Sequence, residues 1–387
     1  MKVWRWIPPW IGTTRPACIA RDVEIIKSVF PEINIPVCKM LTKAFQWDEA
    51  KVNNALQKTV DGVRGAILGL LMVSLPAIRS ISFKDYVWSD ELWIDSMKSI
   101  TGQQDPHSGS SKANLLMDVS ELNLDDQKEG HVVGMGFNIV PFLTLPSLRI
   151  IRGVHVSPAS FARSPIADLH GHCWSPVTEL YLDRSTLDVG RLGELLRCMQ
   201  ALKRFRYDQG LHTNDLYTSK TDRIINELLE YTSCSLESLA VTSGFRVRDS
   251  KNLKPSLKAF RVLRNIDIPA SFLITYRDYC SGSGASTLEA PPVNDVPGLV
   301  EVLPASVETV RLNGAMSWEE VAALLIGLPE GKAEILPKLK EILFMGVQDQ
   351  GEQSAMAFKH LRQKQGMMLQ LSKSSKWAGG YSCWFVF

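Results

Sequence analysis

The chain has 387 residues, of which 45% are hydrophobic and 22% are charged, the proportions of an ordinary soluble globular protein. Its 43 basic and 41 acidic residues give a net charge of +2, so we expect neither nucleic acid nor a membrane as a partner. The seven cysteines contain no C-x-x-C pair. A scattered, odd-numbered set of this kind is typical of reduced thiols in an intracellular protein, cytoplasmic or nuclear.

The N-terminal part of the chain shows no internal repeat. Two short helices are expected over 22–30 and 37–45, with Pro31 and Pro36 between them. We interpret residues 1–60 as a helical cap, because the open side of the first repeat in an array has no neighbour to bury it.

Short strands with a characteristic spacing of apolar residues follow this cap. The pattern predicts a helix over 61–74 and then strands near 75–83, 119–124 and 145–151. The register of the third strand is ambiguous, because Ile150 and Ile151 fit the spacing equally well after Leu148. Surface loops are expected between the strands, over 101–112 and 158–176.

The centre of the chain is its most regular part. Three stretches repeat the spacing L-x-x-L-x-L or a close variant of it, at 177–182, 202–207 and 236–241. Apolar residues at helical spacing lie between them, over 187–199 and 224–229. A short strand of this pattern, an amphipathic helix and the same strand again make the unit of a leucine-rich repeat.

We therefore predict an α/β leucine-rich-repeat solenoid over residues 61–372, curved, with parallel strands on its concave face and helices outside. The side chains of Leu180, Leu182, Leu239 and Leu339 should be fully buried in its core. Residues 373–387 form an apolar tail, which we interpret as a final strand buried on the last repeat. An exposed peptide that binds a partner is the alternative.

The repeat pattern is expected to continue after the centre. We assign the next strand to 257–262, with a short helix around Phe272. This assignment leaves uneven spacings of 21 residues from Leu239 to Phe260 and 50 residues from Phe260 to Val310.

The later repeats enclose one segment of a different composition. Residues 279–298 contain Ser-Gly-Ser-Gly and three prolines, which predicts a flexible insertion. Further strands are expected over 303–312 and 336–344, with a helix after Ser317 whose first turn carries Glu319 and Glu320 in capping positions.

Five phrases of the chain carry a resemblance to a known family. They are Leu-Pro-Ser-Leu-Arg at 145–149, Val-Thr-Glu-Leu at 177–180, Ala-Leu-Lys-Arg-Phe at 201–205, Leu-Pro-Ala-Ser-Val-Glu at 303–308 and Leu-Pro-Lys-Leu-Lys-Glu-Ile at 336–342. With these phrases the repeat region resembles the fungal F-box and leucine-rich-repeat proteins. The resemblance implies a substrate-recognition role in a cullin-type ubiquitin ligase. The F-box pattern itself is not found in residues 1–60, so we expect no binding of the ligase adaptor through them.

The sequence shows no pattern typical of a catalytic or metal site. His170, His172 and Cys173 form a metal-like cluster without a second pair of ligands nearby, so we interpret it as a loop with incidental polar residues. We expect no metal, no cofactor and a non-catalytic protein-interaction scaffold. The alternative is an enzyme with its site on the concave face, which a pocket with converging titratable groups would distinguish.

The side chain between the last two apolar positions of each strand should point away from the core, because side chains alternate along a strand. These positions, with the lysines that precede them, supply the expected partner-binding residues: Tyr181, Arg206, Arg261, Arg311, Lys203 and Lys258. A stripe of arginines suits an acidic or phosphorylated segment of a protein partner. The alternative is a solvated surface neutralised by Glu179, Glu237 and Glu308, which are expected on the same face.

Overall fold

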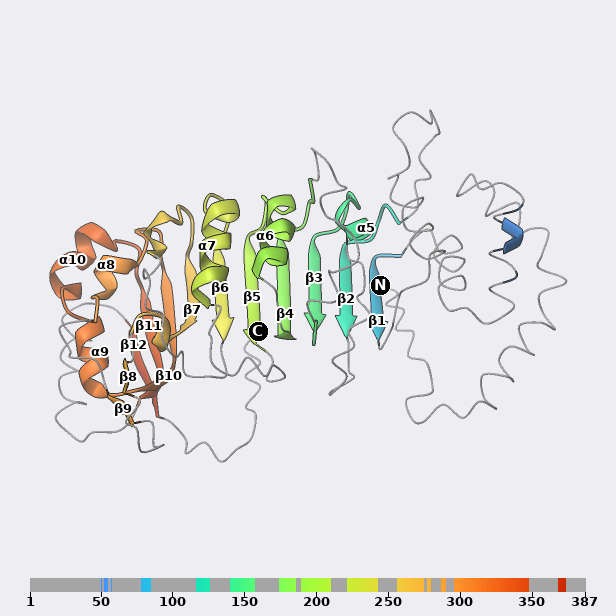
Figure 1. The fold of residues 1–387 in the computed structure, drawn as a ribbon. Helices are drawn as coiled ribbons and strands as arrows, with labels where there is room; N and C mark the ends of the chain where they lie inside the picture. The colour runs from blue at the N-terminus through green and yellow to red at the C-terminus, as the bar shows by residue number, and fades with distance from the viewer. Residues whose placement is uncertain are drawn as a thin grey trace. The chain divides into compact units, whose positions relative to one another are not determined.

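The computed structural model consists of two units, Met1–Ala201 and Leu202–Phe387, which we describe separately. Figure 1 labels the helices and strands of both units. The structure describes residues 50, 52–54, 57, 78–84, 116–125, 140–156, 174–185, 189–209, 221–242, 256–274, 277–279, 287–289, 296–347 and 368–373. No helix within these residues is long and apolar enough to cross a membrane.

Unit 1 contains four parallel strands in the order β1-β2-β3-β4. Their bounds are Ser80–Lys84 for β1, Glu121–Asp125 for β2, Ile150–Val154 for β3 and Glu179–Ser185 for β4. Helix α5 spans Val140–Leu143 before β3, and α6 spans Val189–Cys198 after β4. The order of the strands follows the chain, as in a stack of similar repeats.

Unit 2 contains six parallel strands in the order β5-β6-β7-β10-β11-β12. Their bounds are Arg204–Gln209, Ser238–Thr242, Asn265–Pro269, Thr309–Met316, Glu341–Val347 and Met368–Lys373. Helices α7, α8, α9 and α10 span Thr221–Thr232, Leu299–Val302, Trp318–Leu324 and Leu328–Ile335. The fold is therefore α/β with parallel strands, and neither run closes on itself among the described strands.

The strands begin on a repeated backbone arrangement. The carbonyl oxygen of Lys203, just before β5, accepts the N–H groups of Glu237 at 2.8 Å and Ser238 at 2.9 Å. In the same way the Arg264 carbonyl accepts two N–H groups where β10 starts, and in unit 1 the carbonyl oxygen of Ser120 accepts two where β3 starts. The same pair of bonds registers β2, β3, β4, β6, β7, β10 and β11 on the strand before each of them, which supports the equivalence of the repeats.

The Leu-Pro-x-Leu phrases form tight turns that lead into strands. The N–H of Leu148 donates to the carbonyl oxygen of Leu145 at 3.2 Å, and Leu339 donates to Leu336 at 3.1 Å. Proline suits the second position of such a turn because its φ is already fixed near the required value. All four leucines are buried, so the turn also delivers two apolar side chains to the core.

Burial alternates along the strands as the spacing predicts. Leu180, Leu182, Leu239 and Leu339 expose 0%, 1%, 1% and 2% of their surface, which confirms the predicted register at these positions. In the third strand Ile151 is buried and pairs with Leu180, whereas Ile150 is half-exposed. The structure therefore resolves that ambiguity in favour of Ile151.

The assignment of a strand to 257–262 is wrong. Leu257–Ala259 form a 3-10 helix, η3, and Arg261 and Val262 lie in a bend, while β7 starts at Asn265. The apolar positions belong to Leu263, Ile266 and Ile268, all of which are buried. Both segments fit the apolar spacing, but the later one supplies β-branched residues at the two core positions of the strand. Ile266 pairs with Leu239 and Val310, which changes the uneven spacings to 27 and 44 residues.

Two smaller elements of unit 2 match their sequence signals. Ser317 and Glu320 form the expected capping box at the start of α9: the Ser317 side chain accepts the Glu320 N–H at 3.3 Å, and Glu320 accepts the Ser317 N–H at 2.7 Å. The short helix expected around Phe272 is a 3-10 helix, η4, at Ala270–Phe272.

Several predictions fall on segments outside the described residues. Of the predicted cap, residues 50, 52–54 and 57 are described, and all of them are helical. Around the predicted insertion 279–298, strands β8 (Arg277–Tyr279) and β9 (Thr287–Glu289) form a separate antiparallel pair. The tail beyond Lys373 and the loop with His170, His172 and Cys173 are not described.

A close approach between helices gives a test of the packing in unit 2. A Cβ atom on Gly298, the N-cap residue of α8, would lie 2.6 Å from the backbone oxygen of Ile326. We expect Gly298→Ala to lower the free energy of unfolding by about 1–3 kcal/mol, because backbone atoms must move. At Gly331 the nearest atoms are side-chain ends of Val300 and Ile335 at 3.2 Å. Gly331→Ala, in a helix, should cost less; equal losses in urea denaturation would contradict this packing.

Candidate functional site

One row of side chains in unit 2 lies on the face of the strands opposite the buried leucines. Arg206 on β5 is in register with Ala240 on β6, Asp267 on β7 and Arg311 on β10. All four are half-exposed. Since parallel strands are about 4.8 Å apart, the two arginines flank Ala240 and Asp267 on one surface. We call this set the central row.

Asp267 makes polar contacts with two side chains of β10. Its carboxylate lies 3.5 Å from Nη1 of Arg311 and accepts a short hydrogen bond from the side-chain amide of Asn313. Burial raises the pKa of Asp267 above its ordinary value, while Arg311, Asn313 and Arg206 act in the opposite direction. The row therefore contains a partly desolvated carboxylate between two cations.

The expected basic stripe is not assembled as the sequence suggested. Arg261 lies in the bend before β7 and Lys258 lies in η3, so neither belongs to a strand. The position that Arg261 was expected to take is filled by Asp267, with the opposite charge. Of the predicted basic residues, Arg206 and Arg311 are the two that share the central row.

Charges of alternating sign precede successive strands of unit 2. The equivalent residues, each just before its strand, are Lys203, Glu237, Arg264, Glu308 and Lys340. Measured between nitrogen and oxygen, Lys203 pairs with Glu237 at 3.2 Å, Arg264 with Glu308 at 3.9 Å and Lys340 with Glu308 at 2.5 Å. Lys203, predicted to bind a partner, is thus engaged within the chain. We call these five residues the charge ladder.

The charge ladder should make stability depend on pH. The hydrogen bond from Lys340 lowers the pKa of Glu308, and Arg264 and Lys338 act in the same direction. A carboxylate with a lowered pKa in the folded state contributes stability above its unfolded pKa, and this stability is lost as pH falls through the folded pKa. We expect the urea midpoint to fall less steeply on acidification in Glu308→Gln than in the wild type. Parallel pH profiles would contradict this.

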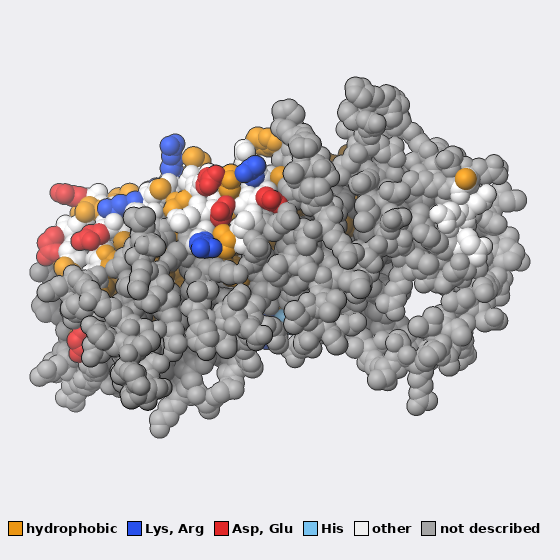
Figure 2. Space-filling model, viewed as in Figure 1, with side chains coloured by type: hydrophobic (Ala, Val, Ile, Leu, Met, Phe, Trp, Pro, Cys, Tyr) orange, Lys and Arg blue, Asp and Glu red, His pale blue; other side chains and the backbone are white. Residues whose placement is uncertain are grey.

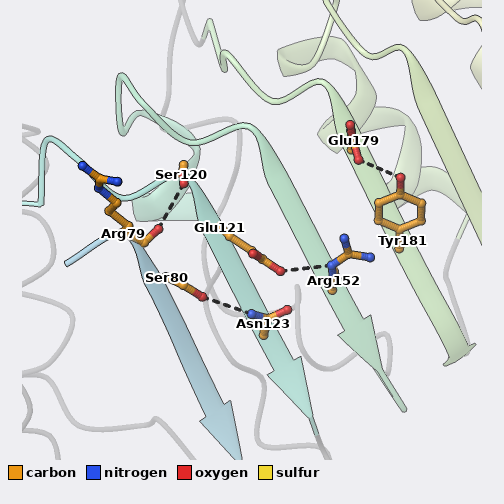
Figure 3. Close-up of polar contacts among 8 residues, drawn as sticks. All are labelled: Arg79, Ser80, Ser120, Glu121, Asn123, Arg152, Glu179 and Tyr181. Atoms are coloured by element: carbon orange, nitrogen blue, oxygen red, sulfur yellow. Dashed lines mark hydrogen bonds and ion pairs between the residues drawn. The ribbon is translucent and has the colours of Figure 1, made fainter. Parts of the chain in front are cut away.

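Tyr181, the expected aromatic anchor, lies in unit 1 within a polar cluster of its own (Figure 3). The Arg152 guanidinium lies over the Tyr181 ring, 4.6 Å from its centroid, and Arg152 Nε is 3.0 Å from the Glu121 carboxylate. The Tyr181 hydroxyl donates to Glu179 at 2.7 Å. One face of the ring is therefore covered by a neighbouring cation of the same unit.

Comparison with known proteins adds no relative. No protein-family model matches the chain, and no curated protein matches it. Among the described residues, no three His, Cys, Asp or Glu side chains come together as a metal site would require. The case for a function therefore depends on the strand face itself.

Sequence reasoning missed Asp267 and its partner Asn313 as site residues. The available signal was the spacing of Leu263, Ile266 and Ile268, which places Asp267 between two core positions. The preceding apolar set, ending at Phe260, concealed it.

Proposed function

We propose that the chain is a non-catalytic protein-interaction scaffold of the leucine-rich-repeat type, and that a protein partner docks on the central row. The repeated strand starts, the chain-ordered parallel strands and the alternating burial support the repeat architecture. The observation that carries the docking proposal is Asp267, a partly buried carboxylate that lies in the central row between Arg206 and Arg311.

The core of unit 2 does not require a charge at this position. The equivalent residue on β6 is Ala240, and on β11 it is Leu343. Desolvating a carboxylate is unfavourable unless it is paired. Arg311 and Asn313 both donate to the Asp267 carboxylate, so they supply the pairing and Asp267 in turn holds their side chains. Fixed polar groups lose little entropy when a partner binds, which is the property expected of a docking site.

Arg206 and Arg311 define the chemistry of the partner. A planar guanidinium binds carboxylate or phosphate groups with two parallel hydrogen bonds. The central row has two arginines and one aspartate, so it has an excess of one positive charge. An acidic or phosphorylated segment suits it, and such a segment competes with Asp267 for Arg311.

The resemblance to F-box and leucine-rich-repeat proteins extends this proposal to a cellular role, the recognition of substrates for ubiquitination. On the face in Figure 2, acidic, basic and hydrophobic side chains are interspersed where the described residues are coloured. Ligase adaptors captured through residues outside 1–60 would support this role, and their absence from repeated captures would contradict it.

The test is a charge reversal with a matched control. We expect Arg206→Glu with Arg311→Glu to abolish capture of partners from an extract of the native host. The control carries Arg223→Glu, on α7, with Arg261→Glu, in the bend before β7; both arginines are exposed and outside the central row. Both variants change the net charge equally. Equal losses of capture in the two variants would contradict a docking site on the central row.

Asp267→Asn should act in the opposite direction to the arginine reversals. Asparagine retains the shape of the side chain but removes the charge that competes for Arg311, so we expect the affinity for an acidic partner to rise. Acidification should have the same effect in the wild type, because protonation of Asp267 releases Arg311. Isothermal titration at several pH values measures both effects. A lower affinity in Asp267→Asn would show that the carboxylate itself contacts the partner.

A further inference from the structure

Two apolar side chains of β11 and one of β12 lie on the same strand face as the central row. Leu343 on β11 is in register with Arg311, and Met345 is in register with Asn313. Both side chains are half-exposed, and Met368 on β12 exposes 47% of its surface. The central-row position itself carries Arg206 on β5, Ala240 on β6, Asp267 on β7, Arg311 on β10, Leu343 on β11 and Gln370 on β12. We call Leu343, Met345 and Met368 the apolar shelf.

The shelf is continuous with the charged part of the face. Met368 pairs with Glu341, two residues before Leu343 on β11, so the two apolar side chains are diagonal neighbours on one face. The Gln370 amide donates to the Met368 sulfur at 2.8 Å, which holds Met368 on this side of β12. Arg311 borders the shelf and its side chain is 38% exposed. The partly exposed guanidinium of Arg311 and the apolar shelf therefore lie on adjacent strands, which are about 4.8 Å apart.

From this juxtaposition we infer that β10, β11 and β12 bind a peptide segment that carries a carboxylate close to a bulky apolar side chain. The carboxylate meets Arg311, and the apolar side chain covers Leu343, Met345 and Met368. Methionine suits such a surface because its flexible, polarisable side chain adapts to different apolar partners. The inference rests on the proposed docking function and specifies the chemistry of the segment that docks.

The probe is a displayed library of random twelve-residue peptides, selected on the full chain at neutral pH. We expect selected peptides to carry Asp or Glu within three residues of Leu, Ile, Met or Phe. Their affinity should fall at least about tenfold in Arg311→Gln and in Met368→Glu, since each removes one half of the site. It should be unchanged in Arg223→Gln, on α7, which leaves both halves intact.

Leu343→Glu adds a second variant within the shelf. Met368 is nearly half-exposed, so Met368→Glu keeps the test valid if Leu343→Glu fails to fold. The inference would be overturned if the selection gave basic peptides or none. It would also be overturned if the selected peptides bound Arg311→Gln, Met368→Glu and Leu343→Glu as tightly as the wild type. Self-association of the chain that Met368→Glu abolishes would also overturn it, because a second copy would then occupy the shelf.

Two outcomes separate this inference from the proposed function. If partners depend on Arg206 and Arg311 but tolerate Met368→Glu and Leu343→Glu, the central row docks partners and the shelf does not. If capture survives reversal of both arginines, the proposed function fails together with the inference.

Discussion

Phe344→Ala is expected to lower the free energy of unfolding by about 3–5 kcal/mol, since it removes a large aromatic side chain from a packed core. Phe344 is fully buried and pairs across the parallel strands with Leu312 on β10 and Leu371 on β12. Phe344 is among the largest fully buried side chains, so its removal leaves a large cavity in the core. Phe344→Leu keeps most of the volume and should cost much less. Urea denaturation compares the two, and a small loss for both would contradict the assigned core of unit 2.

Leu180→Ala is expected to destabilise unit 1 by about 2–5 kcal/mol. Leu180 exposes 0% of its surface and lies in β4 between the half-exposed Glu179 and Tyr181. Tyr181→Ala, one residue further along, removes the stacking of Arg152 and should cost about 0.5–1 kcal/mol. A one-residue shift of register would exchange the two effects. A larger loss for Tyr181→Ala than for Leu180→Ala would therefore contradict the register of β4.

The α/β fold and most of its strands could be predicted from the spacing of apolar residues. Leu180, Leu239 and Leu339 occupy predicted core positions because a strand that buries one face must alternate, and the alternation is visible in the sequence. The capping box of Ser317 and Glu320 was predictable for a local reason, since each side chain satisfies the other's backbone N–H.

The site was predicted less well, because it depends on the register of a single strand. Phe260 satisfies the apolar spacing and is buried, yet it ends a 3-10 turn instead of entering a strand. Because of that error, the prediction assigned Arg261 to the position that Asp267 occupies, and a row of mixed charge was predicted as a basic stripe. The pairing of Asp267 with Asn313 joins strands 46 residues apart, a contact that no local pattern specifies.

The apolar shelf was not anticipated either. Met345 follows the strand predicted over 336–344, whereas β12 with Met368 was not predicted as a strand, and the sequence does not show that their exposed face continues the face of Arg311. That relation follows from the strand order β10-β11-β12, which is a tertiary property.

Site-specific photo-crosslinking tests the docking claim most directly. A photoreactive benzoyl-phenylalanine is placed at Ala240, between Arg206 and Asp267 on the central row, or at Ala333, an exposed alanine on α10. Both replace alanine, so the chemical change is the same at each position. We predict discrete partner adducts from Ala240 that disappear with Arg206→Glu and Arg311→Glu, and no such adducts from Ala333. Adducts from Ala333 but not from Ala240 would contradict docking on the strand face.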